Sequence, residues 1–267
     1  LMWFVGEGGA ALAGRGEVAF GGVGERFLDF AITEAAAAVE AGVILLGCEA
    51  DMLSAIRAAA PTAFLQAGTP HGAAATPDEA IRAGFALLES GADTIYCSHS
   101  PRFIEAMARE GIPVTGHVGL VPNLARFTNF RAIGRKADEA ALVAQQVREI
   151  ENAGASFLEV EVVPVELADW ITRNTRMITM GMGCGDVCDT QYLFSCDVLG
   201  TNVGHYPRHS KRYADFVALE AEMQAKRIQA FRDFTAEVAS KSYPEERHLV
   251  RMTPEEHEKF MGMVQAA

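Results

Sequence analysis

The sequence predicts an α/β protein, a (β/α)₈ TIM barrel with a C-terminal helical tail, and three observations support this fold class. One unit recurs, in which a helical stretch ends at a glycine and a short apolar strand follows, at residues 39–47, 88–97, 108–119 and 151–162. A glycine at a helix end tolerates positive φ, and continuous apolar strands are typical of parallel sheets covered on both faces. Strands and helices alternate over most of the 267 residues, as they do in such a barrel.

Strands are expected at eight places along the chain, the last of them weaker than the others. They lie near residues 3–7, 43–47, 62–67, 93–98, 113–118, 157–162, 177–182 and 192–197. An open, doubly wound sheet is the alternative, because it is built from the same alternation of strands and helices.

Two of the intervening helices have clear start signals. Thr76 is suited to be an N-cap, Pro77 follows at the first helical position, and Glu79 completes a capping box. Ser100 and Pro101 repeat the cap and the proline. Apolar residues at helical spacing predict a tail helix at about 209–239, which we expect to pack outside the barrel or against a partner subunit.

The composition indicates one globular domain that covers residues 1–267. Hydrophobic residues make up 49% and charged residues 22%, and no linker or low-complexity tract divides the chain. The formal net charge of −12 argues against nucleic acid as a partner. The opening residues LMWFV lack the features of a signal peptide or a membrane span, so we expect a cytoplasmic protein without a membrane partner.

The cysteines have two possible interpretations. The five cysteines lack the spacing of a disulfide framework and are expected as reduced thiols, and Cys184 and Cys188 have no second pair that would complete a zinc site. Other cysteines and histidines fall at strand ends and could form a soft-metal cluster, although small thiols packed in a core are the simpler interpretation. These are Cys48, Cys97, His71 and His99.

In a barrel, reactive groups belong at the carboxyl ends of the strands. These ends supply Glu7, Cys48, Glu49, residues 68–71, residues 97–99, His117, Glu161 and the loop GMGCGD at 181–186. The glycine-rich loop could present backbone N–H groups to an anion or simply form a tight turn.

Two carboxylates in FLEVEVVPVELA (157–168) share one face of a strand, because Glu159 and Glu161 are two residues apart. If that face is the barrel interior, Glu159 lies one layer deeper and Glu161 lies nearer the mouth, where it would suit a general base. A structural, ion-paired role remains open for both. His117 would either hydrogen-bond a substrate carbonyl or carboxylate, or be a core histidine.

Several stretches together resemble the ketopantoate hydroxymethyltransferase family, of the phosphoenolpyruvate mutase/isocitrate lyase superfamily. They are AGVILLG (41–47), ATPDEA (75–80), GIPVTGHVGLVP (111–122), Gly134-Arg135, LEVEVVPVELA (158–168), MGMGCGDVCD (180–189), GHYPRHSKRYADF (204–216) and SYPEERH (242–248). The resemblance covers about 41–250, and GHVGLVP followed by EVVPVELA is its most specific part.

The resemblance implies that a small 2-oxo acid binds Mg²⁺ and that a Glu removes the proton next to its carbonyl. The enolate then attacks a one-carbon unit from methylenetetrahydrofolate. By position, the base falls on Glu161 and the active-site His on His117, whereas Glu159 replaces an apolar residue of the family. The strand-two and strand-four motifs give the substrate-binding candidates Gly47, Cys48, Glu49, Tyr96 and Ser98.

By the resemblance, two acids that bind the metal and one acidic residue near it are replaced in this chain. The three positions carry Cys48, Gly68 and Ser98. These residues do not rebuild a site for Mg²⁺, which prefers carboxylate oxygens, so the metal ligands are unknown and folate use is open. Glu7, Glu49 and Asp51 could hold a metal from new positions, and the glycine-rich segment 6–24 could replace a lid.

The sequence therefore predicts an enzyme that makes or breaks a C–C bond by aldol-type chemistry on a small 2-oxo acid, with Glu161 as the general base. The reaction is either that of the family or a related one on another oxo acid. The alternative is a non-catalytic ligand-binding or scaffold barrel that has lost its metal site. The apolar tail helix and the resemblance make a homo-oligomer the expected assembly.

Overall fold

The computed structural model describes residues 2–5, 23–68 and 72–265 of the chain, which forms two compact units. Leu1–Asp215 is the first unit and Phe216–Ala267 is the second. The second unit contains α9 (Phe216–Ser240), η3 (Glu246–His248) and α10 (Pro254–Gln265). The tail helix thus begins at Phe216 rather than near 209, and the organisation as one domain stays a prediction. No helix among the described residues is long and apolar enough to cross a membrane.

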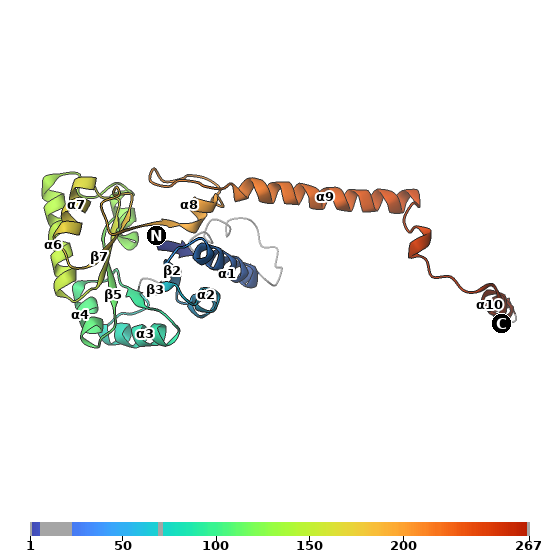
Figure 1. The fold of residues 1–267 in the computed structure, drawn as a ribbon, viewed down its shortest axis with the longest axis horizontal. Coiled ribbons are helices and arrows are strands. Elements are labelled where there is room, and N and C mark those ends of the chain that lie inside the picture. Colours follow the sequence, from blue (N-terminus) through green and yellow to red (C-terminus); the bar gives the residue numbers. More distant parts are fainter. Residues whose placement is uncertain (1, 6–22, 69–71, 266–267) are drawn as a thin grey trace. The chain divides into compact units, whose positions relative to one another are not determined.

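The strands of the first unit are all parallel to their neighbours and pair in chain order. They are β1 (Met2–Val5), β2 (Leu45–Glu49), β3 (Phe64–Gly68), β4 (Thr94–Tyr96), β5 (Val114–Gly119), β6 (Phe157–Glu161), β7 (Ile178–Met182) and β8 (Thr190–Phe194). β8 pairs in turn with β1, with Met2 opposite Tyr192, which differs from the pairing of an open doubly wound sheet. Figure 1 shows α3, α4 and α6 outside β3, β5 and β7.

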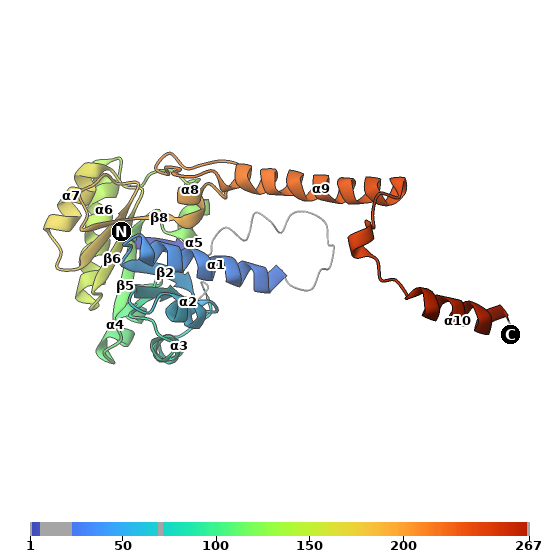
Figure 2. The ribbon, with the colours of Figure 1, turned by 45° about the vertical axis from the view of Figure 1, so that its right-hand side comes forward.

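Helices connect most of these strands. They are α1 (Val23–Glu40), α2 (Leu53–Ala59), α3 (Pro77–Glu89), α4 (Pro101–Arg109), α5 (Pro122–Ala125), η2 (Arg126–Thr128), α6 (Ala137–Asn152), α7 (Val165–Arg173) and α8 (Ser195–Leu199). Figure 2 shows β2, β5, β6 and β8 gathered at the centre of the unit, with α4 and α7 at its outer side. The predicted α/β class, with a curled parallel sheet and covering helices, is confirmed.

The alternation of strands and helices departs from the prediction between β7 and β8. Residues 183–189 join β7 directly to β8, and none of them is helical. The last strand was expected near 192–197 but spans Thr190–Phe194, because residues from Ser195 onward form α8 instead. A short apolar run such as YLFSCDVL fits either a strand or a helix, so its periodicity alone could not place the boundary.

The two helix starts differ in their caps. At α3 the Thr76 hydroxyl accepts the N–H of Glu79, and the Glu79 carboxylate accepts the N–H of Thr76 at 3.1 Å, so the predicted capping box is confirmed. At α4, Ser100 is the N-cap and Pro101 the first helical residue, as predicted, but the Ser100 side chain makes no cap hydrogen bond.

Alternate residues of each strand face opposite sides of the sheet. One set, including Leu46, Leu65 and Leu158, packs in the large core between the strands and the helices. The other set, including Leu45 and Met180, forms a smaller cluster with Phe157 packed against it. Glu159 and Glu161 share the register of Phe157, so they belong to this inner face.

Arg57 on α2 ties together the amino-terminal ends of β3 and β4. Its guanidinium donates to the carbonyl oxygens of Gly91, Pro61 and Ala63, at distances between 2.7 and 3.2 Å. It also pairs with the carboxylate of Asp93, which precedes β4. One side chain therefore satisfies carbonyl groups of two loops on the face opposite the carboxyl ends of the strands.

We expect Arg57→Ala to lower the free energy of unfolding by about 2–3 kcal/mol, because hydrogen bonds from a charged donor contribute more than neutral ones. Arg109→Ala is the matched control, since Arg109 is largely exposed and its ion pair with Glu105 is an i,i+4 pair on the helix surface. That control should cost at most about 0.5 kcal/mol. Urea unfolding of both variants measures the difference, and equal losses would contradict the role of Arg57.

Candidate active site

Glu159 and His117 face each other across β5 and β6, where they are direct partners in the register. The Glu159 Oε2 atom lies 3.3 Å from His117 Nδ1. The other carboxylate oxygen, Oε1, accepts a hydrogen bond of 2.6 Å from the side-chain amide of Gln66 on β3. Both Glu159 and Gln66 are almost fully buried, so this carboxylate is held from two sides inside the sheet.

Glu161 lies on the opposite side of the same imidazole. Its Oε2 atom is 3.2 Å from His117 Nε2, so the ring stands between two carboxyl groups. The side chain of Glu159 is 3% exposed and that of His117 is 1% exposed, whereas that of Glu161 is 13% exposed. Glu161 is therefore the most exposed member of this row.

Two tyrosines adjoin this row. Tyr96, at the end of β4, shares a hydrogen bond of 2.7 Å between its Oη atom and His117 Nδ1. Tyr192 on β8 is buried, and burial raises the pKa of its phenol well above the usual value. The charges of Glu159 and Glu161 raise the pKa of Tyr192 further. Tyr192 therefore keeps its proton and can serve as a hydrogen-bond donor.

The backbone around Glu161 is tightly constrained. The Glu161 carbonyl oxygen accepts the N–H of Leu120 at 2.9 Å, and a Cβ atom on Gly119 would come within 2.0 Å of that oxygen. The next residue, Val162, has a φ of 50°, which is costly for a β-branched residue. Its N–H donates to Met182 and its carbonyl accepts from Ile133, so neighbouring segments hold it in this conformation.

Some of the predicted substrate-binding residues lie near His117 in the structure, and others do not. Tyr96 contacts His117 directly, and Gly47 lies opposite Gln66 in the register of β2 and β3. Glu49 is half-buried at the end of β2, and burial, with a smaller contribution from Asp51, raises its pKa. Ser98 is half-buried beyond β4.

The Cys48 side chain lies on the face of β2 that is turned away from His117. It packs in the large core with Leu53 and Ile56 of α2, on the outer face of β2. Cys97 lies in the same core, and the His99 ring packs on Phe103 at 4.8 Å. His71 and Glu7 lie outside the described residues. The two buried thiols thus follow the simpler interpretation of small groups in a core.

The described residues do not fit the Mg²⁺ ion that the resemblance implies. Among residues 2–5, 23–68 and 72–265, no three His, Cys, Asp or Glu side chains lie together as metal ligands. Glu159 does not replace the missing metal-binding acids, because Gln66 and His117 lie against its two carboxylate oxygens. Cys48 lies in the outer core and Gly68 has no side chain, so the hard oxygen donors that Mg²⁺ prefers are missing at these positions.

Sequence reasoning missed several residues of the site. Gln66, Tyr192 and His209 did not stand out, although Gln66 is the polar residue in an otherwise apolar strand, FLQAG. The ring of His209 lies against Gly183, where an added Cβ would come within 3.0 Å of it. Burial lowers the pKa of His209, while the nearby Glu161 and Asp197 oppose that shift. His209 therefore lies in the electrostatic field of the site.

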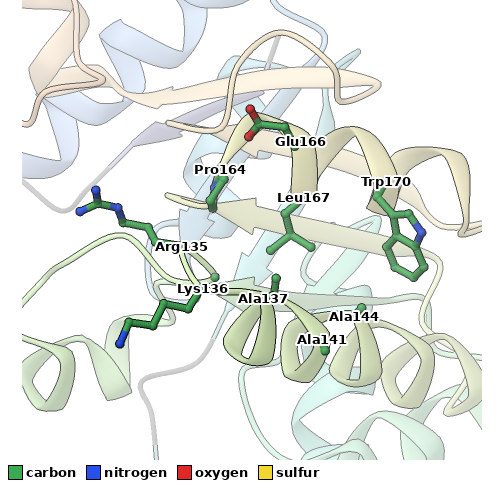
Figure 3. A pocket seen from close by; sticks show the side chains of 11 residues that line it. Arg135, Lys136, Ala137, Ala141, Ala144, Pro164, Glu166, Leu167 and Trp170 are labelled. Atoms are coloured by element: carbon green, nitrogen blue, oxygen red, sulfur yellow. The ribbon is translucent and has the colours of Figure 1, made fainter.

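A separate pocket lies outside the sheet, between α6 and α7. It has a volume of about 450 Å³, and its polar lining consists of Arg135, Lys136 and Glu166. Figure 3 shows Ala137, Ala141 and Ala144 along one wall and Trp170 at its end. None of the residues around His117 lines this pocket, so it is distinct from the site described above.

Comparison with known families agrees with the resemblance. A sequence profile described as ketopantoate hydroxymethyltransferase matches residues 33–246. A 3-methyl-2-oxobutanoate hydroxymethyltransferase of Chloroflexus aurantiacus is 34% identical over 191 residues, which cover 70% of this chain and 66% of the relative. One from Escherichia coli O17:K52:H18 is 33% identical over 199 residues, which cover 73% of each chain.

Comparison with solved structures supports the fold alone. A protein from Burkholderia cenocepacia J2315, provisionally named a phosphonomutase, superposes with a TM-score of 0.50 and 12% sequence identity. The match covers 74% of this chain and 90% of that protein.

Proposed function

The chain belongs to the ketopantoate hydroxymethyltransferase family, a family of transferases, and from this premise we propose that it removes a proton from carbon 3 of a small 2-oxo acid. The resulting enolate carbon then forms a bond to a one-carbon electrophile. The observation that carries the proposal is the row Glu159, His117 and Glu161, whose outer member is the more exposed one. The non-catalytic alternative is not favoured by this family membership.

Glu161 is the proposed general base. In its ionised form it takes the proton from carbon 3, while its Oε2 atom remains beside His117 Nε2. His117 can then receive that proton or supply one, since its other ring nitrogen lies beside Glu159 and Tyr96. Glu159 is a positioning residue, because it fixes the ring from the side that a substrate does not reach.

The charge that develops on the enolate oxygen needs a partner in this site. In the proposal, the phenols of Tyr192 and Tyr96 donate hydrogen bonds to it, since a protonated donor that is already oriented stabilises such charge. The high pKa of Tyr192 supports this role, because the phenol remains protonated at neutral pH. No step is assigned to a metal ion, because the described carboxylates do not form a site for one.

The fold, location, assembly and ligand of the chain complete the proposal. The strands of the first unit form one complete eight-stranded barrel, residues 1–267 belong to a single domain, and the protein is cytoplasmic. The chain assembles as a homo-oligomer, which the exposed apolar side chains Leu219, Phe231 and Phe234 of α9 support. The small 2-oxo acid is its ligand.

Exchange of the carbon 3 proton tests the proposed function without any one-carbon donor. We expect the protein to release tritium from 3-methyl-2-oxobutanoate labelled at carbon 3, and to do so after treatment with a chelator. Release that occurs only when Mg²⁺ is restored would overturn the metal-independent step. No release in the presence or absence of Mg²⁺ would overturn the family reaction for this chain.

A further inference from the structure

Two thiols meet in the loop between β7 and β8. The Sγ atoms of Cys184 and Cys188 are 3.8 Å apart. Gly181 leaves the room that they fill, because a Cβ atom there would come within 2.9 and 3.0 Å of the two sulfur atoms. Cys184 is fully buried, whereas Cys188 is half-buried.

Cys188 differs from the other cysteines in its electrostatic surroundings. A hydrogen bond from the Cys184 thiol lowers the pKa of Cys188 to about 7, and the hydroxyls of Thr172 and Thr179 assist. Burial raises the pKa of Cys48 to about 12 and that of both Cys97 and Cys196 to about 11. The pKa of Cys184 is raised as well, first by its hydrogen bond to Cys188 and then by burial. Cys188 is therefore the cysteine that carries a thiolate at neutral pH, and the thiolate is the reactive form.

We propose that Cys184 and Cys188 form a thiol–disulfide exchange site that a low-molecular-weight disulfide oxidises reversibly. The Cys188 thiolate attacks one sulfur of the small disulfide, so that a mixed disulfide forms and one small thiolate leaves. Cys184 then loses its proton to that thiolate or to solvent and attacks Cys188 Sγ, which expels the second small thiolate. The two cysteines lose two electrons, and the small disulfide gains them.

Oxidation at this loop would act on the strand that carries Glu161. The Cys184 Sγ atom lies 3.4 Å from the carbonyl oxygen of Val160, so its single hydrogen is shared between that oxygen and Cys188. Val160 directly precedes Glu161 in β6. A disulfide removes that donor. The loop also contacts His209 through Gly183. This expectation rests on the proposed function: the oxidised protein should exchange the carbon 3 proton several-fold more slowly. Reduction should restore the full rate.

The test treats the full chain with oxidised glutathione near neutral pH and follows thiols and mass. We expect two thiols to disappear, with a mass loss of two hydrogens, and dithiothreitol to restore both. In Cys184→Ser the mixed disulfide with glutathione should accumulate at Cys188, because the second attack is removed. In Cys188→Ser neither product should form. Cys196→Ser is the matched control and should behave like the unaltered chain.

The outcomes separate this site from the proposed function. If the unaltered chain keeps all its thiols, or if Cys184→Ser and Cys188→Ser lose thiols as the unaltered chain does, the exchange site is overturned. Because the thiol and mass readouts need no substrate, they stand even if the chain fails to exchange the carbon 3 proton. Disulfide formation without a change in exchange rate would overturn only the coupling to Glu161.

Discussion

Replacing Glu161 with glutamine is expected to slow tritium release from carbon 3 by about 10²- to 10⁴-fold, the range that a positioned general base contributes. Glutamine has nearly the same shape and still reaches His117, but its amide cannot accept the proton. The rate constant at saturating substrate should fall while substrate affinity changes little, because the substitution removes an interaction made only in the transition state.

Two controls make this result specific to the carboxylate of Glu161. Glu149→Gln on α6 makes the same chemical change at an exposed position, where the Glu149 carboxylate accepts a hydrogen bond from the side chain of Gln145. Its exchange rate should equal that of the unaltered chain. Urea unfolding of Glu161→Gln should show a folded protein. If a folded Glu161→Gln variant exchanges the proton at the original rate, Glu161 is not the base.

Replacing Glu159 has the second large effect that we expect. Glu159→Gln removes the charge beside His117 Nδ1 and should slow proton exchange by about 10- to 100-fold, less than the loss at Glu161 because Glu159 does not touch the substrate. The pH profile should also shift, since the charge that faces the imidazole has changed. An unchanged profile together with an unchanged rate would show that Glu159 has only a structural role.

The stability of Glu159 variants supplies an independent measurement. Glu159→Leu leaves the buried amide of Gln66 without its acceptor and should lower the free energy of unfolding by about 1–3 kcal/mol. The double variant Gln66→Leu with Glu159→Leu replaces both partners by apolar groups, so it should recover part of that loss. If the double variant is as unstable as the sum of the two single changes, the pair contributes no coupled energy.

The sequence allowed the class of fold and the two faces of β6 to be predicted. Apolar strands that follow glycine-terminated helices indicated the parallel sheet, and the two-residue spacing of Glu159 and Glu161 placed them on one face. The same alternation could have turned Cys48 away from the site, since Gly47 and Glu49 on either side of it belong to the opposite face of β2. Its place at a strand end and the resemblance had both favoured Cys48.

Contacts between distant parts of the chain could not be predicted in this way. Gln66 and Glu159 are 93 positions apart, and nothing in either strand indicates that one will hold the other. The role of Glu159 follows only when β3, β5 and β6 lie together around His117. His209 was missed for the same reason, because its segment lies outside the repeating helix and strand pattern and reaches the site through its contact with Gly183.

The guanidinium of Arg57 bears on how such a chain could diverge from its relatives. It secures the starts of β3 and β4. The positions at which the resemblance implies acids, Gly68 and Ser98, lie at or beyond the opposite ends of the same strands. Mutations at those distant ends leave the anchoring hydrogen bonds untouched. Substitutions could therefore remove a metal site at those strand ends, while the fold keeps the stabilising contacts of Arg57.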